Sequence, residues 1–314
     1  MRRLKRLIRA ALWRRIKRRF AGEIGQLVDA ATVAARTTDQ EFSALRQATA
    51  KNIILKSSGD IWFEARFNDV DVVLPGDTIR TMIHCIYSTE ECPILIAVED
   101  NHLHWMISKL QPGSVFLDVG AATGAMSVPI AKRFGESVAL YAFEPARKAR
   151  ALLIATLDRN ALTAVTVIPE AVADTIGAVT FAEFVYDEAS DRPYLPETST
   201  IHTPMIEGTD MLRYDVPVTT LDAFAAEHGL LGRPAVVKVD VEGFEVQVLR
   251  GAAAYLAAAR PWLAIDIHRD PFGEDTTEAK VVGILEPLGY SIERMGHVVL
   301  ASPTVSSPET PPNA

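Results

Sequence analysis

From residue 114 onward, short apolar runs alternate with segments of helical periodicity, and this alternation limits the fold more than any other feature of the chain. Five runs have the length and β-branched character of strands: Val115–Val119, Ala139–Phe143, Val165–Ile168, Ala235–Val239 and Leu263–Ile267. Such apolar runs are typical of a parallel sheet that helices cover on both faces. We therefore expect a doubly wound, Rossmann-like α/β domain.

Shorter patterns flank the alternation. Near the C-terminus, Ser291–Met295 and His297–Ala301 are separated by one glycine and predict a closing hairpin. Near the N-terminus, Ile53–Leu55 and Ile61–Phe67 flank Ser-Ser-Gly-Asp and predict another hairpin. Residues 183–215 are rich in proline and small polar residues, so we expect a long irregular loop that acts as a lid over the acceptor.

Length and composition suit a folded protein with a sizeable core, because 48% of the 314 residues are hydrophobic and 23% are charged. The patterns divide the chain into a basic amphipathic segment (1–21), a helical and hairpin lead-in (22–109), a ligand-binding α/β domain (110–302) and a disordered, proline-rich tail (303–314). Two cysteines exclude a disulfide-rich scaffold, and no secretory signal is present, so we expect a cytoplasmic location.

The net charge of −8 hides an uneven distribution. Residues 1–20 hold ten Lys and Arg and no acid, which leaves 22 basic against 40 acidic residues in the remainder, a net charge of −18. The apolar positions Leu4, Leu7, Ile8 and Leu12 share one helical face. This pattern suits a helix that lies on an anionic membrane, at the inner face of that membrane. The alternatives are a solvated tail and a tail that docks on the acidic remainder of the chain. A body of this charge disfavours nucleic acid as a partner.

The stretch Val115–Gly124 carries the first chemical signal. An apolar run leads into a turn with Gly120 and Gly124, and Glu144 stands at the end of the next run. Glycines allow the backbone to approach a ligand closely, and an acid at this position can accept hydrogen bonds from ribose hydroxyls. The spacing differs from the G-x-G-x-x-G dinucleotide fingerprint, and Asp118 suits the positive amino group of a methionyl moiety better than a pyrophosphate. The pattern therefore indicates S-adenosylmethionine.

A second group of polar residues follows the fourth and fifth runs. Asp240 and Glu242 come directly after the fourth run, and His268 comes directly after the fifth. Lys238 lies two residues before Asp240 and therefore on the same side of the strand. Since ligands bind at the carboxyl edge of open α/β sheets, these residues are candidates for acid–base chemistry. A purely structural role for His268 at a strand end is the alternative.

Together these motifs resemble the FkbM family of S-adenosylmethionine-dependent methyltransferases, over roughly residues 77 to 301. The resemblance rests on Asp118–Gly124 (DVGAATG), Phe143–Pro145 (FEP), Thr220–Asp222 (TLD), Lys238–Glu245 (KVDVEGFE) and Leu249–Gly251 (LRG). It implies a class I methyltransferase fold: a mostly parallel, seven-stranded sheet with an antiparallel C-terminal strand, here with an N-terminal helical extension. It also implies O-methylation of a hydroxyl on a sugar, glycan, lipid-linked or secondary-metabolite acceptor.

The resemblance further implies which residues bind the cofactor. Asp118, Gly120 and Gly124 would hold the methionyl end, Glu144 the ribose, and Glu170 with Ala171 the adenine. The complete cofactor set that we expect is Asp118, Gly120, Ala121, Thr123, Gly124, Glu144, Pro145, Glu170 and Ala171.

Two positions depart from the family pattern. Ala122 stands where the family commonly has asparagine, which removes an amide near the cofactor, and Asp266 stands where glutamate is expected. The loss of the amide predicts weaker cofactor binding.

For catalysis we expect Asp240, Glu242 and His268 to orient the acceptor hydroxyl or remove its proton. Paired acids could instead bind a divalent ion that lowers the pKa of the hydroxyl. A separate metal site is disfavoured because the spacing of Cys85 and Cys92 is unlike that of zinc ligands; His84, His102 and His104 are the other residues near them. Two other functions remain open: a nicotinamide-dependent oxidoreductase on a similar sheet, and a non-catalytic, membrane-associated binding protein.

Overall fold

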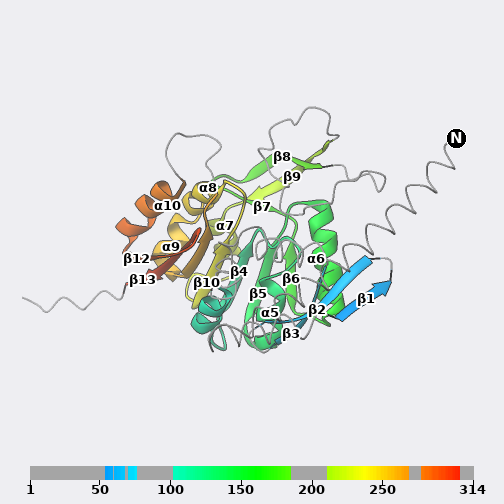
Figure 1. Cartoon of the computed structure of the whole chain (residues 1–314). Coiled ribbons are helices and arrows are strands. Elements are labelled where there is room, and N and C mark those ends of the chain that lie inside the picture. Colours follow the sequence, from blue (N-terminus) through cyan, green and yellow to red (C-terminus); the bar gives the residue numbers. More distant parts are fainter. Residues whose placement is uncertain are drawn as a thin grey trace, which may run out of the picture.

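The computed structural model describes residues 54–58, 60–67, 70–75, 102–184, 211–268 and 277–304 (Figure 1). The predictions for residues 1–53, including the basic segment, lie outside this part of the chain, as do those for His84, Cys85, Cys92 and residues 305–314. Within the described residues, no helix combines the length and the apolar character that crossing a membrane requires.

A seven-stranded sheet forms the centre of the molecule, with the strand order β12-β13-β11-β10-β4-β5-β6. Its strands are β4 (Val115–Val119), β5 (Ala139–Phe143), β6 (Val165–Ile168), β10 (Ala235–Val239), β11 (Trp262–Asp266), β12 (Tyr290–Met295) and β13 (Val298–Pro303). Neighbouring strands from β6 to β11 are parallel, whereas β13 is antiparallel to both β11 and β12. This is the class I methyltransferase-like sheet that the sequence predicted, with the antiparallel hairpin at its C-terminal edge.

Helices cover both faces of this sheet. On one face lie α5 (Ser127–Phe134), α6 (Arg147–Arg159) and helical residues 102–109; on the other lie α7 (Leu221–Glu227), α8 (Glu245–Arg250), α9 (Ala253–Ala259) and α10 (Thr277–Leu285). Along β4, Phe116 packs on the first face, and Val115, Leu117 and Val119 pack on the second. Every residue of β4 and β10 is buried, which explains why these strands are nearly uninterrupted apolar runs.

A three-stranded antiparallel sheet packs beside α5 and α6. It contains β1 (Ile54–Ser58), β2 (Asp60–Phe67) and β3 (Val70–Pro75), so the predicted hairpin is confirmed and extended by one strand. The side chain of Asn160 connects β3 to α6. Its amide accepts a hydrogen bond from Val73 N at 2.9 Å and donates one to Val73 O at 2.7 Å.

A second small sheet contains β7 (Ala171–Val172), β8 (Gly177–Phe184) and β9 (Met211–Thr219). The prediction of an irregular segment over residues 183–215 was wrong at both ends, because Glu183 pairs with Leu212 in the β8–β9 ladder. Tyr214, Val216 and Val218 are buried while the residues between them are exposed. Alternation of buried and exposed residues is typical of a strand with one buried face, so the charged residues lie on the exposed face. Residues 185–210 are outside the described chain.

Candidate active site

The predicted functional residues gather where the strand order reverses, at the carboxyl ends of β4 and β10. These two strands are adjacent and parallel, with Asp118 paired to Lys238 in the ladder. The chain leaves β4 toward β5 on one side, while β10 and β11 lie on the other. In open α/β sheets the crevice at this position binds ligands.

The glycine turn after β4 requires glycine at both predicted positions. Gly120 has φ +82°, and a Cβ atom there would lie 1.8 Å from the carbonyl oxygen of Asp240. Gly124 has φ +91°, and its Cβ would lie 2.8 Å from Cδ1 of Leu153 in α6. The turn is therefore pressed against the end of β10 and against α6, an approach that no larger residue permits without displacement.

Between the two glycines, Ala121 and Thr123 are buried, and Ala122 has a left-handed backbone with φ +47°. Asparagine tolerates this conformation better than alanine because its short polar side chain can bond locally. The backbone geometry thus gives a physical reason for the asparagine that the family resemblance led us to expect at this position. Ala122 N–H donates a 2.8 Å hydrogen bond to Oε2 of Glu144.

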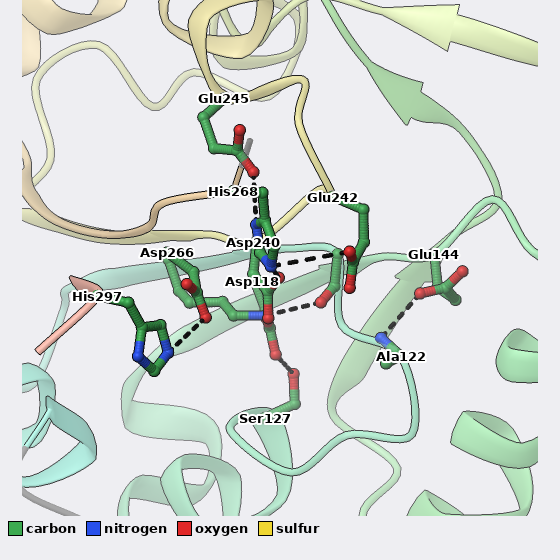
Figure 2. A network of polar contacts seen from close by, with 12 residues as sticks. Asp118, Ala122, Ser127, Glu144, Asp240, Glu242, Glu245, Asp266, His268 and His297 are labelled. Atoms are coloured by element: carbon green, nitrogen blue, oxygen red, sulfur yellow. Dashed lines mark hydrogen bonds and ion pairs between the residues drawn. The ribbon is translucent and has the colours of Figure 1, made fainter. Parts of the chain in front are cut away.

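Glu144 is buried at the end of β5, beside this turn (Figure 2). Its second oxygen, Oε1, accepts a 2.8 Å hydrogen bond from Ala146 N–H. Burial raises the pKa of Glu144 to about 7, against the opposing effects of the two backbone donors and of the charges on Lys238 and Arg150. The carboxylate is held in a fixed position and retains lone pairs for further donors. Pro145 follows it directly.

The other residues expected near adenine lie farther along the same edge. Glu170 is half-buried in the short connection between β6 and β7. Ala171 begins β7 and is buried in a small apolar cluster with Ala146, which follows Glu144 and Pro145. The connection after β6 therefore reaches the segment that carries Glu144.

Asp118 is buried with two polar neighbours. Ser127 Oγ donates to its Oδ2 at 2.6 Å, and Lys238 Nζ lies 3.5 Å from its Oδ1. The same ammonium lies 3.1 Å from Asp240 Oδ2 and donates a 2.7 Å hydrogen bond to Gly120 O. Burial by itself lowers the pKa of Lys238, but Asp240 and Asp118 outweigh this effect and hold the pKa above its ordinary value. Lys238 thus joins the glycine turn to the acids after β10.

The three predicted catalytic residues meet beyond this lysine. His268 Nε2 lies 3.9 Å from Asp240 Oδ1 and 3.8 Å from Glu242 Oε2, while its Nδ1 lies 2.9 Å from Glu245 Oε1 (Figure 2). Burial lowers the pKa of His268, but Glu245, Asp240, Glu242 and Asp266 raise it to about 9. In the protein without ligands the imidazole is therefore protonated at neutral pH, a state that does not suit a general base.

Glu242 is the most exposed of these acids, with 37% of its side chain accessible. Its backbone lies in the left-handed region with φ +55°. Burial raises the pKa of Glu242 to about 7; His268 opposes this effect, and Asp240 adds to it. Strained backbone of this kind is concentrated at functional sites, because only surrounding structure can maintain it.

Several residues of the cluster were not selected from the sequence: Ser127, Glu245, and Asp266 as a partner of His297. Glu245 is fully buried and belongs to the motif after β10, but only the fold reveals that it contacts His268. His102 is buried in helical residues 102–109, and burial lowers its pKa to about 4; His104, also considered as a metal ligand, is exposed on the same helix.

A family model described as the methyltransferase FkbM domain matches residues 118–292, more than half of the chain. The chain belongs to the FkbM methyltransferase family. This is a family of S-adenosylmethionine-dependent methyltransferases, so the assignment disfavours the oxidoreductase alternative. The matched region extends from Asp118 to β12 and includes the glycine turn and the acids after β10.

Solved structures give more distant likenesses to this FkbM protein. The methyltransferase FkbM from Methylobacillus flagellatus is 16% identical with a TM-score of 0.40; the match covers 71% of this chain but only 57% of that protein. A SAM-dependent methyltransferase from Aquifex aeolicus is 15% identical with a TM-score of 0.35, over 63% of this chain and 87% of that one. No curated protein matches the sequence. The fold assignment rests on the strand order, not on these likenesses.

The FkbM family implies S-adenosylmethionine, and the residues present fit that cofactor. Both turn glycines have positive φ, so the backbone after β4 can approach a ligand. Glu144 presents a buried carboxylate at the end of the neighbouring strand. One expectation about the methionyl end changes. Without any ligand, the Asp118 carboxylate already forms an ion pair with Lys238 and accepts a hydrogen bond from Ser127, so its negative charge is partly neutralised.

Proposed function

We propose that this FkbM protein transfers a methyl group from S-adenosylmethionine to a hydroxyl of a sugar, glycan, lipid-linked or secondary-metabolite acceptor. The observation that carries the proposal is the position of Lys238. Its ammonium contacts Gly120 O, Asp118 and Asp240, which places the glycine turn directly beside the acids after β10. A methyl donor bound at the turn would therefore face side chains that can orient an alcohol and accept its proton.

We assign the cofactor to the sequence-predicted residues. The turn from Asp118 to Gly124, including Ala121 and Thr123, would hold the methionyl end, and Glu144 would accept hydrogen bonds from the ribose hydroxyls. Pro145, Glu170 and Ala171 would border the adenine. The geometry that supports this assignment is the hydrogen bond between Ala122 N and Glu144 Oε2, which keeps the carboxylate beside the turn.

When bound, S-adenosylmethionine supplies an activated sulfonium methyl group. The protein's task is then to align the acceptor oxygen and to remove its proton, so that proximity provides much of the catalysis. Asp240, Glu242 and His268 would orient the hydroxyl, and Glu242 is the acid most accessible to an acceptor. In the protein without a bound cation, protonated His268 would hold the two carboxylates in place through its Nε2.

Calorimetry with S-adenosylhomocysteine tests the cofactor assignment. We expect saturable binding by the wild type and at least tenfold weaker binding by Glu144→Ala, because two hydrogen bonds to a charged group are lost. Wild-type protein that shows no saturable binding would refute the cofactor assignment. Equal binding by Glu144→Ala would refute the ribose role alone.

A screen of hydroxyl-bearing acceptors with isotope-labelled S-adenosylmethionine tests the reaction. We expect label in a methyl ether of at least one sugar or secondary-metabolite alcohol, and less of it with Glu242→Gln. Label found only on nitrogen, carbon or sulfur would contradict O-methylation. Label on no acceptor would favour the remaining alternative, a non-catalytic binding protein.

The basic segment supports a separate proposal about location. Residues 1–20 carry ten Lys and Arg, and we propose that they bring the enzyme to an anionic membrane surface beside a membrane-linked acceptor. Removing residues 1–20 should abolish sedimentation with anionic vesicles and leave cofactor binding intact. Equal sedimentation of both proteins would contradict the proposal.

A further inference from the structure

We propose that Asp240, Asp266 and His268 form a binding site for one divalent cation at the acceptor end of the active site. Each residue offers one ligand atom, and the three atoms lie within 4.8 Å of one another. Asp240 follows β10, Asp266 ends β11, and His268 follows β11, so two adjacent strands supply the whole set. Bonds of about 2.1 Å place adjacent octahedral ligands about 3 Å apart and opposite ligands about 4 Å apart, so an ion would draw the three atoms together by roughly 1 to 2 Å.

Each of the three residues has two polar side-chain atoms. A neighbouring side chain contacts one of them, and the other is the proposed ligand. Oδ2 of Asp240 pairs with Lys238 at 3.1 Å, and Nδ1 of His268 pairs with Glu245 at 2.9 Å. Oδ2 of Asp266 lies 3.3 Å from Nε2 of His297. These contacts fix the orientation of each side chain; Figure 2 shows those of His268 with Glu245 and of Asp266 with His297.

The remaining atom of each residue has no hydrogen-bond partner within the described part of the chain. Oδ1 of Asp266 is buried and has no hydrogen-bond partner there. Nε2 of His268 and Oδ1 of Asp240 are 3.9 Å apart, which is too far for a hydrogen bond. A buried carboxylate oxygen without a partner is costly, and a cation would satisfy it.

The contact between His268 and Glu245 is the arrangement that metal-binding histidines use. Such a histidine donates its other ring N–H to a carboxylate, which fixes the tautomer and makes the free nitrogen a better ligand. Glu245 is fully buried and also accepts a 3.0 Å hydrogen bond from Gly243 N–H. The imidazole is thereby oriented with Nε2 toward Asp240, and a cation would bind Nε2 in place of a proton.

The charge of the cluster also favours a cation. Lys238 lies between Asp118 and Asp240, so a single ammonium serves two carboxylates. The two histidines of the cluster, His268 and His297, contact the three other acids, Glu242, Glu245 and Asp266, so acids outnumber basic groups. One imidazole nitrogen and two carboxylate oxygens, completed by water, suit Mn²⁺ or a similar divalent ion.

The chemical use of the ion rests on the proposed function. A bound hydroxyl would replace one water, and the cation would lower its pKa. The hydroxyl would lose its proton to solvent, its oxygen would form the bond to the methyl carbon, and the carbon–sulfur bond would break to release S-adenosylhomocysteine.

Binding of Mn²⁺ to the full chain, followed by electron paramagnetic resonance without any methyl donor, tests the site. We expect one equivalent at micromolar affinity, with a nitrogen coupling that disappears in His268→Gln. Asp240→Asn and Asp266→Asn should each weaken binding at least 100-fold, and Glu245→Gln should weaken it about 10- to 100-fold. Glu293→Gln, on an exposed part of β12, is the matched control and should bind normally.

Circular dichroism checks that each variant is folded. Should the Asp266 variant unfold, the more exposed Asp240 and His268 variants still decide the question. Wild-type protein that binds no Mn²⁺ below millimolar concentration overturns the site, as does unchanged affinity in both Asp240→Asn and His268→Gln. Because the measurement needs no methyl transfer, its failure leaves the proposed O-methylation standing. Normal Mn²⁺ binding by a protein that methylates no acceptor would refute only the proposed O-methylation.

Discussion

A Cβ atom on Gly120 would stand 1.8 Å from the carbonyl oxygen of Asp240, so the turn after β4 and the turn after β10 meet backbone to backbone. Gly120→Ala must therefore separate the two turns as well as adopt an unfavourable φ of +82°. We expect a loss of more than about 3 kcal/mol in the free energy of unfolding, together with loss of S-adenosylhomocysteine binding. Urea denaturation and calorimetry measure the two effects.

Gly113→Ala is the matched control, because Gly113 has φ +89° but nothing within 4 Å of an added Cβ. It should cost only about 1 to 2 kcal/mol and leave cofactor binding unchanged. Equal losses for the two variants would show that the close approach to Asp240 does not matter.

Ala122→Asn should stabilise the protein and tighten cofactor binding. Asparagine relieves the left-handed strain at φ +47°, which predicts a gain of about 0.5 to 1 kcal/mol in unfolding free energy. Its amide also offers one more hydrogen bond to the cofactor, worth about 2- to 10-fold in affinity. Thermal denaturation and calorimetry with S-adenosylhomocysteine check both values.

Ala161→Asn separates the two contributions. Ala161 has φ +56° at the end of α6 and is exposed. It should give a similar gain in stability with no change in affinity. If Ala122→Asn changed affinity no more than this control, the amide would have no role at the cofactor.

Binding of S-adenosylhomocysteine should strengthen as pH rises through about 7. The pKa of Glu144 is raised to about 7 by burial, and ribose hydroxyls donate to the ionised form, so protonation competes with binding. Affinity should therefore be about tenfold weaker at pH 6 than at pH 8, since one pH unit below the pKa leaves about a tenth of the carboxylate ionised. Calorimetry across this range measures the slope.

Glu144→Gln should remove this slope, because an amide does not titrate. Glu293→Gln, on exposed β12, should retain it. A slope that persists in Glu144→Gln would assign the titration to another group.

Lys238→Met should destabilise the protein by about 3 to 5 kcal/mol, because it leaves the carboxylates of Asp118 and Asp240 without their shared cation. The double variant with Asp118→Asn should recover about 1 to 3 kcal/mol of this loss, since one of the two unpaired charges is gone. A double-mutant cycle from urea denaturation gives the coupling. Strict additivity would mean that Lys238 and Asp118 do not interact energetically.

Much of the sheet could be predicted from sequence because its central strands are buried on both faces. Four strands match the predicted runs to the residue, and β11 differs by one. β3 and β9 were missed since each buries one face only, so polar residues such as Asp71 and Asp215 interrupt the apolar run. Tertiary contacts, not hydrophobicity, determine that such segments form strands.

The site was predictable as far as strand ends determine it. Parallel strands bring their carboxyl ends to one edge, which is why Asp240 and His268 were expected together. The hydrogen bond from His268 to Glu245 could not be foreseen, because it joins a strand end to the first turn of α8. The left-handed backbone at Glu242 was equally hidden, since glutamate gives no sign of positive φ.

The hydrogen bonds of the Asn160 amide place the β1–β3 sheet where it could serve to attach the protein to a solid support. Helix α6 begins two residues after Pro145, next to the carboxylate of Glu144, and Asn160 follows its last residue after a length of about 20 Å. The β1–β3 sheet is thus hydrogen-bonded to the end of α6 that lies farther from Glu144. Immobilising the protein through this sheet should leave the sheet edge that carries Glu144 facing away from the support, where bulky acceptors could be tested.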